Sequence, residues 1–142
     1  MTTGEILSIL GGKPVIGHIQ SPLEMVQAVH RGLPWKAFKT VEATLSVSQS
    51  ELASMLHITP RTLARRKALG RLAAMESDRL VRIARIIAHA IEVFEDESKA
   101  LDWLSSENRA LGGQKPLRLL DTDIGVREVD NVLGRIEHGI FG

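Results

Sequence analysis

The chain has 142 residues, 44% of them hydrophobic and 25% charged, with a formal net charge of +1 and no cysteine. This length and hydrophobicity allow a buried core and argue against disorder, and the missing cysteine excludes disulfides, a thiol nucleophile and cysteine-bound zinc. Apolar runs fall short of the roughly 18 residues that a membrane span needs, and residues 1–13 lack a signal-peptide pattern, so we expect a soluble, cytoplasmic protein with no membrane contact.

Strand signals are scarce, so we predict an all-α fold. Tyrosine is absent, aromatic residues make up 4% of the chain, and Val and Ile recur at helical spacing. Residues 1–20 are glycine-rich with weak periodicity. We predict a mostly irregular arm there, with one helical turn at residues 5–10 and a short extended stretch at Val15 and Ile16.

Two helices are predicted between residues 21 and 45. Ser21 is followed by Pro22 and, three residues after Ser21, by Glu24, which is the pattern of a helix N-terminus. Gly32 should end that helix near residue 30. The next helix begins at Pro34, and its core spacing is carried by Phe38, Val41 and Leu45.

The remaining helices are predicted from capping residues and from residues that end helices. A capping box at Ser48 and Glu51 opens a short helix that runs to residue 56, and Thr59 with Pro60 opens another that ends near residue 70. Ser77 can cap a long helix to residue 94. Further helices are expected at residues 99–105, 117–120 and 126–137, with a loop at residues 108–116.

Residues 46–70 have the pattern of a helix-turn-helix. Leu52 and Leu56 face inward on the first helix, and the small Ala53 between them lets a second helix cross closely. Ile58 can fill the angle of the turn, and Leu63 can anchor the second helix to the first. The second helix is therefore the one that can enter a DNA major groove.

A basic block coincides with that second helix. Residues 61–85 carry a net charge of +6 in a chain of +1, which suggests an anionic partner for this block. Helix N-termini and arginine forks suit phosphates and guanine edges. The predicted DNA-binding residues are Ser48, Gln49, Thr59, Arg61, Thr62, Arg65, Arg66, Lys67 and Arg71. The alternative is an ordinary helix pair with a solvated basic face.

The next three arginines leave two interpretations open. These are Arg79, Arg82 and Arg85, which lie on the long helix opposite its apolar stripe. They fit either a solvated face or a second contact with phosphate or a partner.

Signatures of enzymes are missing. There is no phosphate-binding glycine loop, no HExxH zinc motif and no nucleophile elbow. The five histidines are scattered without a metal-ligand pair, and His89 fits a core or boundary position on the long helix. We therefore predict no catalytic residue, no metal and no cofactor.

The C-terminus is unusually apolar for a chain end. Ile140 and Phe141 lie within the last three residues, whereas chain ends are usually polar. Gly134 lies within the last predicted helix at a cost of about 1 kcal/mol relative to Ala, which close packing of another backbone would explain. The apolar end either packs on its own core, forms a homodimer or contacts another protein.

The chain from Leu45 to Phe141 carries seven short motifs in a recognisable order. They are Glu51-Leu52-Ala53, Arg61-Thr62-Leu63, Ser77-Asp78-Arg79-Leu80, Ala100-Leu101-Asp102-Trp103-Leu104, Asn108-Arg109-Ala110-Leu111-Gly112-Gly113, Pro116-Leu117 and Gly134-Arg135-Ile136-Glu137-His138-Gly139-Ile140-Phe141. In these motifs the sequence resembles the Xre/MbcA/ParS antitoxins, the partners of RES-domain toxins. The last motif is the most specific of the seven.

The resemblance implies an antitoxin with two activities. It implies a toxin partner with an ADP-ribosyltransferase-like fold that consumes NAD, whose NAD pocket is covered by the antitoxin's C-terminal end. It also implies repression of the antitoxin's own operon, as a dimer on a palindromic operator, and larger assemblies with the toxin. The residues expected near the toxin by matching position are Arg135, Glu137, His138, Ile140, Phe141 and Gly142.

Three regions are therefore expected along the chain. Residues 1–45 form an arm and helices that could dimerise, residues 46–76 the helix-turn-helix module, and residues 77–142 a helical toxin-binding domain. Residues 21–45 are the dimerisation candidate, although they fit the core of the DNA-binding module equally well. The alternative function is a stand-alone transcriptional regulator whose C-terminal domain only dimerises.

Overall fold

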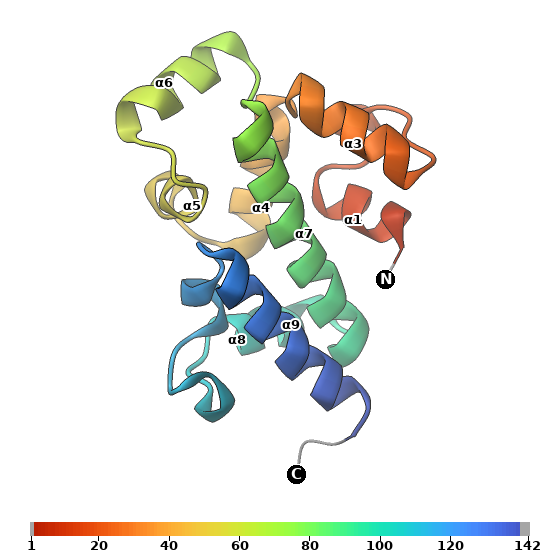
Figure 1. Ribbon diagram of the computed structural model, residues 1–142, viewed down its shortest axis with the longest axis vertical. Coiled ribbons are helices and arrows are strands. Elements are labelled where there is room, and N and C mark those ends of the chain that lie inside the picture. The colour runs from red at the N-terminus through yellow and green to blue at the C-terminus, as the bar shows by residue number, and fades with distance from the viewer. Residues whose placement is uncertain (1, 140–142) are drawn as a thin grey trace. The chain divides into compact units, whose positions relative to one another are not determined.

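A computed structural model of the chain describes residues 2–139 and confirms the all-α fold class (Figure 1). Over these residues there are nine α-helices, two 3-10 helices and no strand. The helices are α1 (Thr3–Ile9), α2 (Lys13–Ile16), α3 (Pro22–Arg31), α4 (Trp35–Leu45), α5 (Gln49–Met55), α6 (Pro60–Leu69), α7 (Ala74–Phe94), α8 (Glu97–Leu104), η1 (Arg109–Leu111), η2 (Pro116–Leu119) and α9 (Asp123–Glu137). The chain divides into two compact units, residues 1–84 and 85–142, at a point within α7. The three-part division drawn from the sequence stays a prediction.

The N-terminal arm is more ordered than predicted. The helical turn expected at residues 5–10 is α1. Thr2 and Glu5 form a complete capping box at its N-terminus. The extended stretch expected at Val15 and Ile16 is wrong, because both residues belong to the short helix α2. Pro14 in the first turn of α2 favours a helix start there, since its ring presets a helical φ.

Helices α3 and α4 confirm the predicted caps and core spacing. The hydroxyl of Ser21 accepts from the backbone N–H of Glu24, and α3 ends at Gly32. Helix α4 buries the predicted apolar positions Phe38, Val41 and Leu45, together with Ala37. The ring of Trp35 stacks on that of Phe38 with centroids 4.7 Å apart.

The segment after α6 is hydrogen-bonded to the turn between α3 and α4. The N–H of Leu72 donates to the carbonyl of Leu33 at 2.9 Å, and the N–H of Trp35 donates to the carbonyl of Gly70 at 2.9 Å. Gly32 makes this approach possible, because a Cβ there would lie 2.1 Å from the carbonyl oxygen of Leu72 and its φ is +90°. The end of α6 is thereby fixed to the core of the N-terminal unit.

Helix α7 begins three residues before the predicted Ser77 cap. The carboxylate of Glu76 accepts from the backbone N–H of Ala73 at 2.8 Å, so Glu76 caps the helix from inside its first turn. Ser77 is fully buried and has another role: its hydroxyl accepts from the N–H of Leu33 at 2.8 Å. The sequence pattern correctly predicts a polar capping side chain at the start of α7, but the capping residue is Glu76 and not Ser77.

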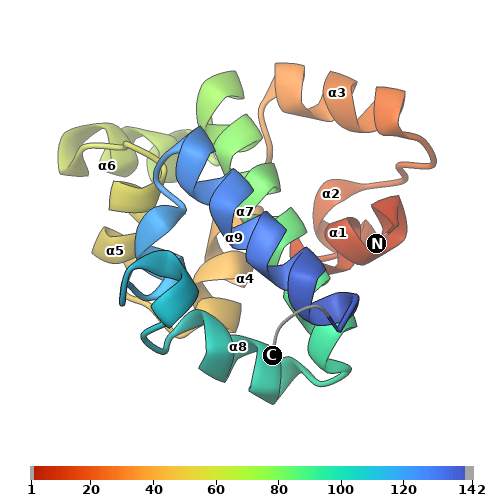
Figure 2. The same ribbon diagram turned by 60° about the horizontal axis from the view of Figure 1, so that its bottom comes forward.

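In the C-terminal unit, α9 lies alongside the second half of α7 (Figure 2). Helix α9 starts three residues earlier than predicted, because the hydroxyl of Thr122 caps it by accepting from Gly125. The predicted loop at residues 108–116 contains η1, and the predicted short helix after it is the 3-10 helix η2. Helix α9 buries Val126, Val129, Val132 and Leu133, which form its core face. None of the helices in the described part of the chain has both the length and the apolar character of a membrane crossing.

Candidate nucleic-acid interface and partner-binding helix

Helices α5 and α6 form the predicted helix-turn-helix corner. Leu52 and Leu56 have no exposed surface, and Ala53, Ile58 and Leu63 are each exposed by 6% or less. The small Ala53 lies where the two helices cross, as the motif requires. Each residue chosen from the sequence as an apolar contact of this corner is therefore in its core.

The turn between the helices has a left-handed residue where glycine is common. His57 has a φ of +58°, a conformation that residues other than glycine adopt infrequently, with Asn, Asp and His the most frequent among them. The N–H of Ile58 donates to the carbonyl of Ala53 at 2.9 Å and closes the end of α5. Glycine would adopt this backbone conformation without a steric cost.

Two predicted DNA-binding residues are the caps of these helices. The Ser48 hydroxyl accepts from the N–H of Glu51 at 3.0 Å, and the Glu51 carboxylate accepts from the N–H of Ser48 at 3.3 Å. The Thr59 hydroxyl accepts from the N–H of Thr62 at 3.2 Å, and Thr62 itself is half-buried. The N-termini of α5 and α6 are thus correctly capped.

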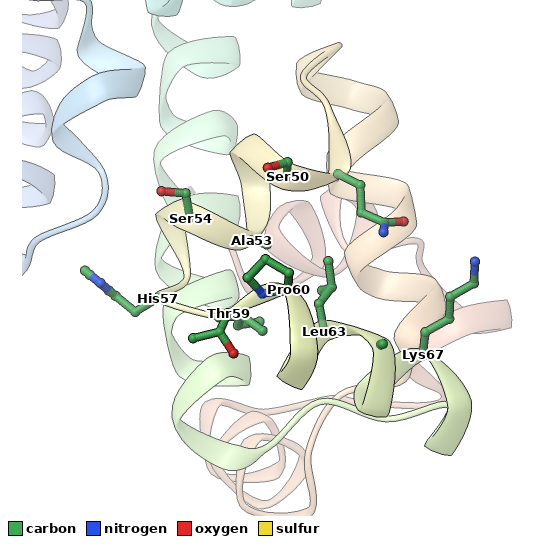
Figure 3. Close-up of a pocket in the computed structure, with 11 residues that line it drawn as sticks. Ser50, Ala53, Ser54, His57, Thr59, Pro60, Leu63 and Lys67 are labelled. Carbon is green, nitrogen blue, oxygen red and sulfur yellow. The ribbon is translucent and has the colours of Figure 1, made fainter.

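A groove of about 720 Å³ runs between α5 and α6 (Figure 3). We call it the HTH groove; its apolar lining includes Ala53, Pro60 and Leu63. His57 and Lys67 lie on opposite sides of it in Figure 3. The groove brings together three predicted DNA-binding residues from different elements: Gln49, Thr59 and Lys67.

The arginines of α6 divide into two kinds. Arg61 and Arg65 are exposed and lie one turn apart on the same face of the helix. Arg66 instead keeps 18% of its side chain exposed and forms an ion pair with Glu76, with Nε 2.8 Å from Oε1. The hydrogen bond to Glu76 raises the pKa of Arg66 above its ordinary value. The prediction that Arg66 belongs to the exposed basic face is corrected: it joins α6 to α7.

Two further arginines make contacts within the chain that periodicity does not reveal. Arg71, which we expected on phosphate, donates from Nη1 to the carbonyl oxygens of Gly32 at 2.7 Å and Arg31 at 3.3 Å. Arg79 donates from Nη1 to the carbonyl oxygen of Leu56 at 3.1 Å. That carbonyl lies at the end of α5, so Arg79 holds the helix-turn-helix against α7. This agrees with neither of the two roles considered for Arg79.

The last turn of α9 carries the predicted toxin-binding residues that the structure describes. Arg135, Glu137 and His138 are all exposed there. The other predicted contacts, Ile140, Phe141 and Gly142, lie outside the described residues. Gly134 is partly exposed, and a Cβ at this position would meet nothing within 4 Å. Within the described chain, the close packing expected against Gly134 is therefore wrong.

His89 makes a contact with α9 that the sequence did not suggest. Its Nδ1 lies 2.7 Å from Oδ1 of Asp130, and its Nε2 lies 3.4 Å from Oε1 of Glu137. The side chain is 11% exposed, which agrees with the boundary position predicted for it. Across residues 2–139 no three His, Asp or Glu side chains gather where a metal ion could be held.

Both halves of the chain match known families. Residues 24–85 match the family described as the Antitoxin Xre-like helix-turn-helix domain. Residues 89–139 match the family described as the Antitoxin Xre/MbcA/ParS C-terminal toxin-binding domain. The first match covers α5 and α6, and the second covers His89 and α9.

Whole proteins are similar as well. An Antitoxin Xre of Yersinia enterocolitica is 32% identical over 119 residues, which are 82% of this chain and 80% of that protein. A Prs ADP-ribosylating antitoxin of a Sphingobium species is 28% identical over 131 residues, which are 85% of this chain and 82% of that protein. A chain in the crystal structure of the M. tuberculosis MbcT-MbcA toxin-antitoxin complex is similar in fold, with a TM-score of 0.53, 21% identity and coverage of 87% of this chain and 100% of its own. By its sequence and its order of domains, this chain belongs to the Xre/MbcA/ParS family of antitoxins.

Proposed function

We propose that this chain is the antitoxin of a type II toxin-antitoxin system, in which it neutralises a RES-domain toxin and represses its own operon. The observation that carries the proposal is the match of two different family domains, one in each structural unit: the helix-turn-helix domain at residues 24–85 and the toxin-binding domain at residues 89–139. We propose that the chain acts by binding, not as an enzyme, and that it does so in the cytoplasm.

The toxin is proposed to be an NAD-consuming enzyme. One relative has ADP-ribosylation in its name, and another solved relative comes from a toxin-antitoxin complex; ADP-ribosylation uses NAD as its substrate. The exposed polar side chains at the end of α9, Arg135, Glu137 and His138, suit the rim of such a pocket. The residues that follow, 140–142, are proposed to cover the active site.

Operator DNA is the proposed ligand of α6. Arg61 and Arg65 are exposed, and arginine can bond both acceptors of a guanine edge. Gln49, Thr59 and Lys67 around the HTH groove are proposed to contact the phosphate backbone. Arg66 and Arg71 are left out of the proposed interface, because Glu76 and backbone carbonyls hold them.

A palindromic operator requires two copies of the chain, and the surface between α3 and α7 is the proposed contact between them. It contains a groove of about 420 Å³ whose apolar lining includes Val26 and Met75. These side chains are 46% and 67% exposed and line the same groove, so a second copy of the chain would cover apolar surface there. Val26 belongs to the segment 21–45 that the sequence proposes for dimerisation, whereas Met75 lies outside it.

Separating the two activities tests the proposal. A chain that lacks residues 139–142 should lose neutralisation, measured as the growth of cells that also express the toxin encoded by the neighbouring gene. The same truncated chain should bind operator DNA like the full chain in a gel-shift assay. Growth protection by the truncated chain would contradict the proposed role of the C-terminus.

A further inference from the structure

The last turn of α9 has little apolar anchoring. Val126, Val129, Val132 and Leu133 bury the helix up to residue 133. Among the described residues after that point, none is fully buried. The turn also begins with Gly134, the poorest helix former apart from proline. A contact other than core packing can therefore help to keep residues 134–137 helical.

The position of Glu137 makes the last turn of α9 depend further on a stabilising contact. A carboxylate at the C-terminal end of a helix faces the negative end of the helix dipole, which is unfavourable unless a cation compensates it. Nε2 of His89 lies 3.4 Å from the Glu137 carboxylate, so a protonated His89 ring would supply the compensating charge. This distance is at the long end of hydrogen bonding.

The other edge of the His89 ring is held by a shorter contact. Nδ1 lies 2.7 Å from Oδ1 of Asp130, which is seven residues and two turns before Glu137 on the same face of α9. Ionised carboxylates only accept hydrogen bonds, so a ring that donates to both must carry a hydrogen on each nitrogen and hence a positive charge. We call this arrangement, Asp130–His89–Glu137, the His89 bridge. On α7 itself, Arg85 and Glu92 are the charged residues one turn before and one turn after the ring.

We propose that His89 is a positioning residue for toxin binding. The His89 bridge spans the last two turns of α9 and keeps them helical before the toxin arrives, so that Arg135 and His138 are presented in their binding arrangement. A segment ordered in advance loses less conformational entropy on binding and therefore binds more tightly. The inference rests on the proposed function, because it assigns the end of α9 to toxin contact.

Amide hydrogen exchange of the full chain without toxin tests the structural part. His89→Gln and Glu137→Gln should each raise exchange at residues 134–139 by roughly three- to tenfold, the worth of one such contact. Exchange at Val126 and Val129, which are buried on the core face, should stay the same. Glu128→Gln is the matched control, since it removes one exposed carboxylate from the same helix and should change neither region.

Two further variants distinguish the His89 bridge from ordinary packing: the double variant at residues 89 and 137, and the replacement of His89 by another cation. His89→Gln with Glu137→Gln should exchange no faster than His89→Gln alone, because Glu137 has already lost its contact with residue 89 in that single variant. His89→Arg should retain protection, since its planar cation also donates along two edges. Unchanged exchange at residues 134–139 in His89→Gln would overturn the proposal, as would loss of protection in Glu128→Gln.

Toxin affinity links the bridge to function. With the purified, catalytically inactivated toxin encoded by the neighbouring gene as the probe, His89→Gln and Glu137→Gln should weaken binding by similar factors, roughly three- to tenfold. His89→Arg should bind more tightly than His89→Gln. Faster exchange with full toxin affinity would overturn the positioning role. If the unmodified chain does not bind the toxin, the proposed function itself fails, and the exchange results show separately whether the bridge holds α9.

Discussion

Replacing Glu76 with alanine should destabilise the N-terminal unit by about 4 kcal/mol. One carboxylate oxygen of Glu76 accepts both from Nε of Arg66 and from the N–H of Ala73, each at 2.8 Å. The two side chains of the ion pair are 18% and 10% exposed. Because a guanidinium is always protonated in proteins, Arg66 would stay charged and be left without its partner in Glu76→Ala.

The magnitude follows from these two losses. Breaking a buried ion pair costs about 3–5 kcal/mol, and losing a helix cap costs about 1 kcal/mol. Since nearly a fifth of the Arg66 side chain remains in water, the lower end of this range applies. Urea unfolding followed by circular dichroism measures the change in the free energy of unfolding.

Asp78→Ala is the matched control for this prediction. Asp78 is also an acid in α7, but its side chain is 61% exposed and its ion pair with Arg82 is 3.6 Å long. Asp78→Ala should therefore lower the free energy of unfolding by less than about 1 kcal/mol. Replacing the pair together, as Arg66→Met with Glu76→Leu, should recover most of the loss, because no charge is then left buried. Equal costs for Glu76→Ala and Asp78→Ala would refute the reasoning.

Three further predictions concern single positions. Gly134→Ala should raise the free energy of unfolding of the free chain by up to about 1 kcal/mol, because nothing lies within 4 Å of the new Cβ; a loss of stability in urea would contradict this. Arg61→Ala and Arg65→Ala should each weaken binding to operator DNA by about 1–3 kcal/mol if they contact bases, and a residue that contacts only phosphate should instead weaken binding to all sequences alike and lower the salt dependence. His57→Val should destabilise the chain by about 1–2 kcal/mol, since a β-branched side chain is poorly tolerated at its φ of +58°, whereas His57→Asn should melt close to the unmodified chain.

The sequence was most informative where structure depends on neighbours in the chain. The caps of α3, α5 and α6 were predicted correctly, because a capping hydroxyl and the N–H that donates to it are three residues apart. The helix-turn-helix corner was predictable for a similar reason. Its apolar contacts, from Leu52 to Leu63, lie within a dozen residues, and their spacing fixes which side each one faces.

Contacts between distant segments could not be predicted in the same way. His89 and Asp130 are 41 residues apart, and His89 and Glu137 are 48 apart, so no helical period relates them. Arg66 looked like one more member of a basic face, because the sequence does not show that Glu76 lies opposite it. The sequence also suggests Ser77 as a cap. It does not show that the Ser77 hydroxyl accepts instead from the N–H of Leu33, 44 residues away.

The most direct test of the proposed antitoxin activity is the NAD turnover of the purified neighbouring-gene toxin, titrated with this chain. The full chain should abolish turnover when it reaches the concentration of toxin sites, whereas the chain that lacks residues 139–142 should leave turnover high while still binding operator DNA. Unchanged NAD turnover in the presence of excess full chain, or equal inhibition by the truncated chain, would contradict the account.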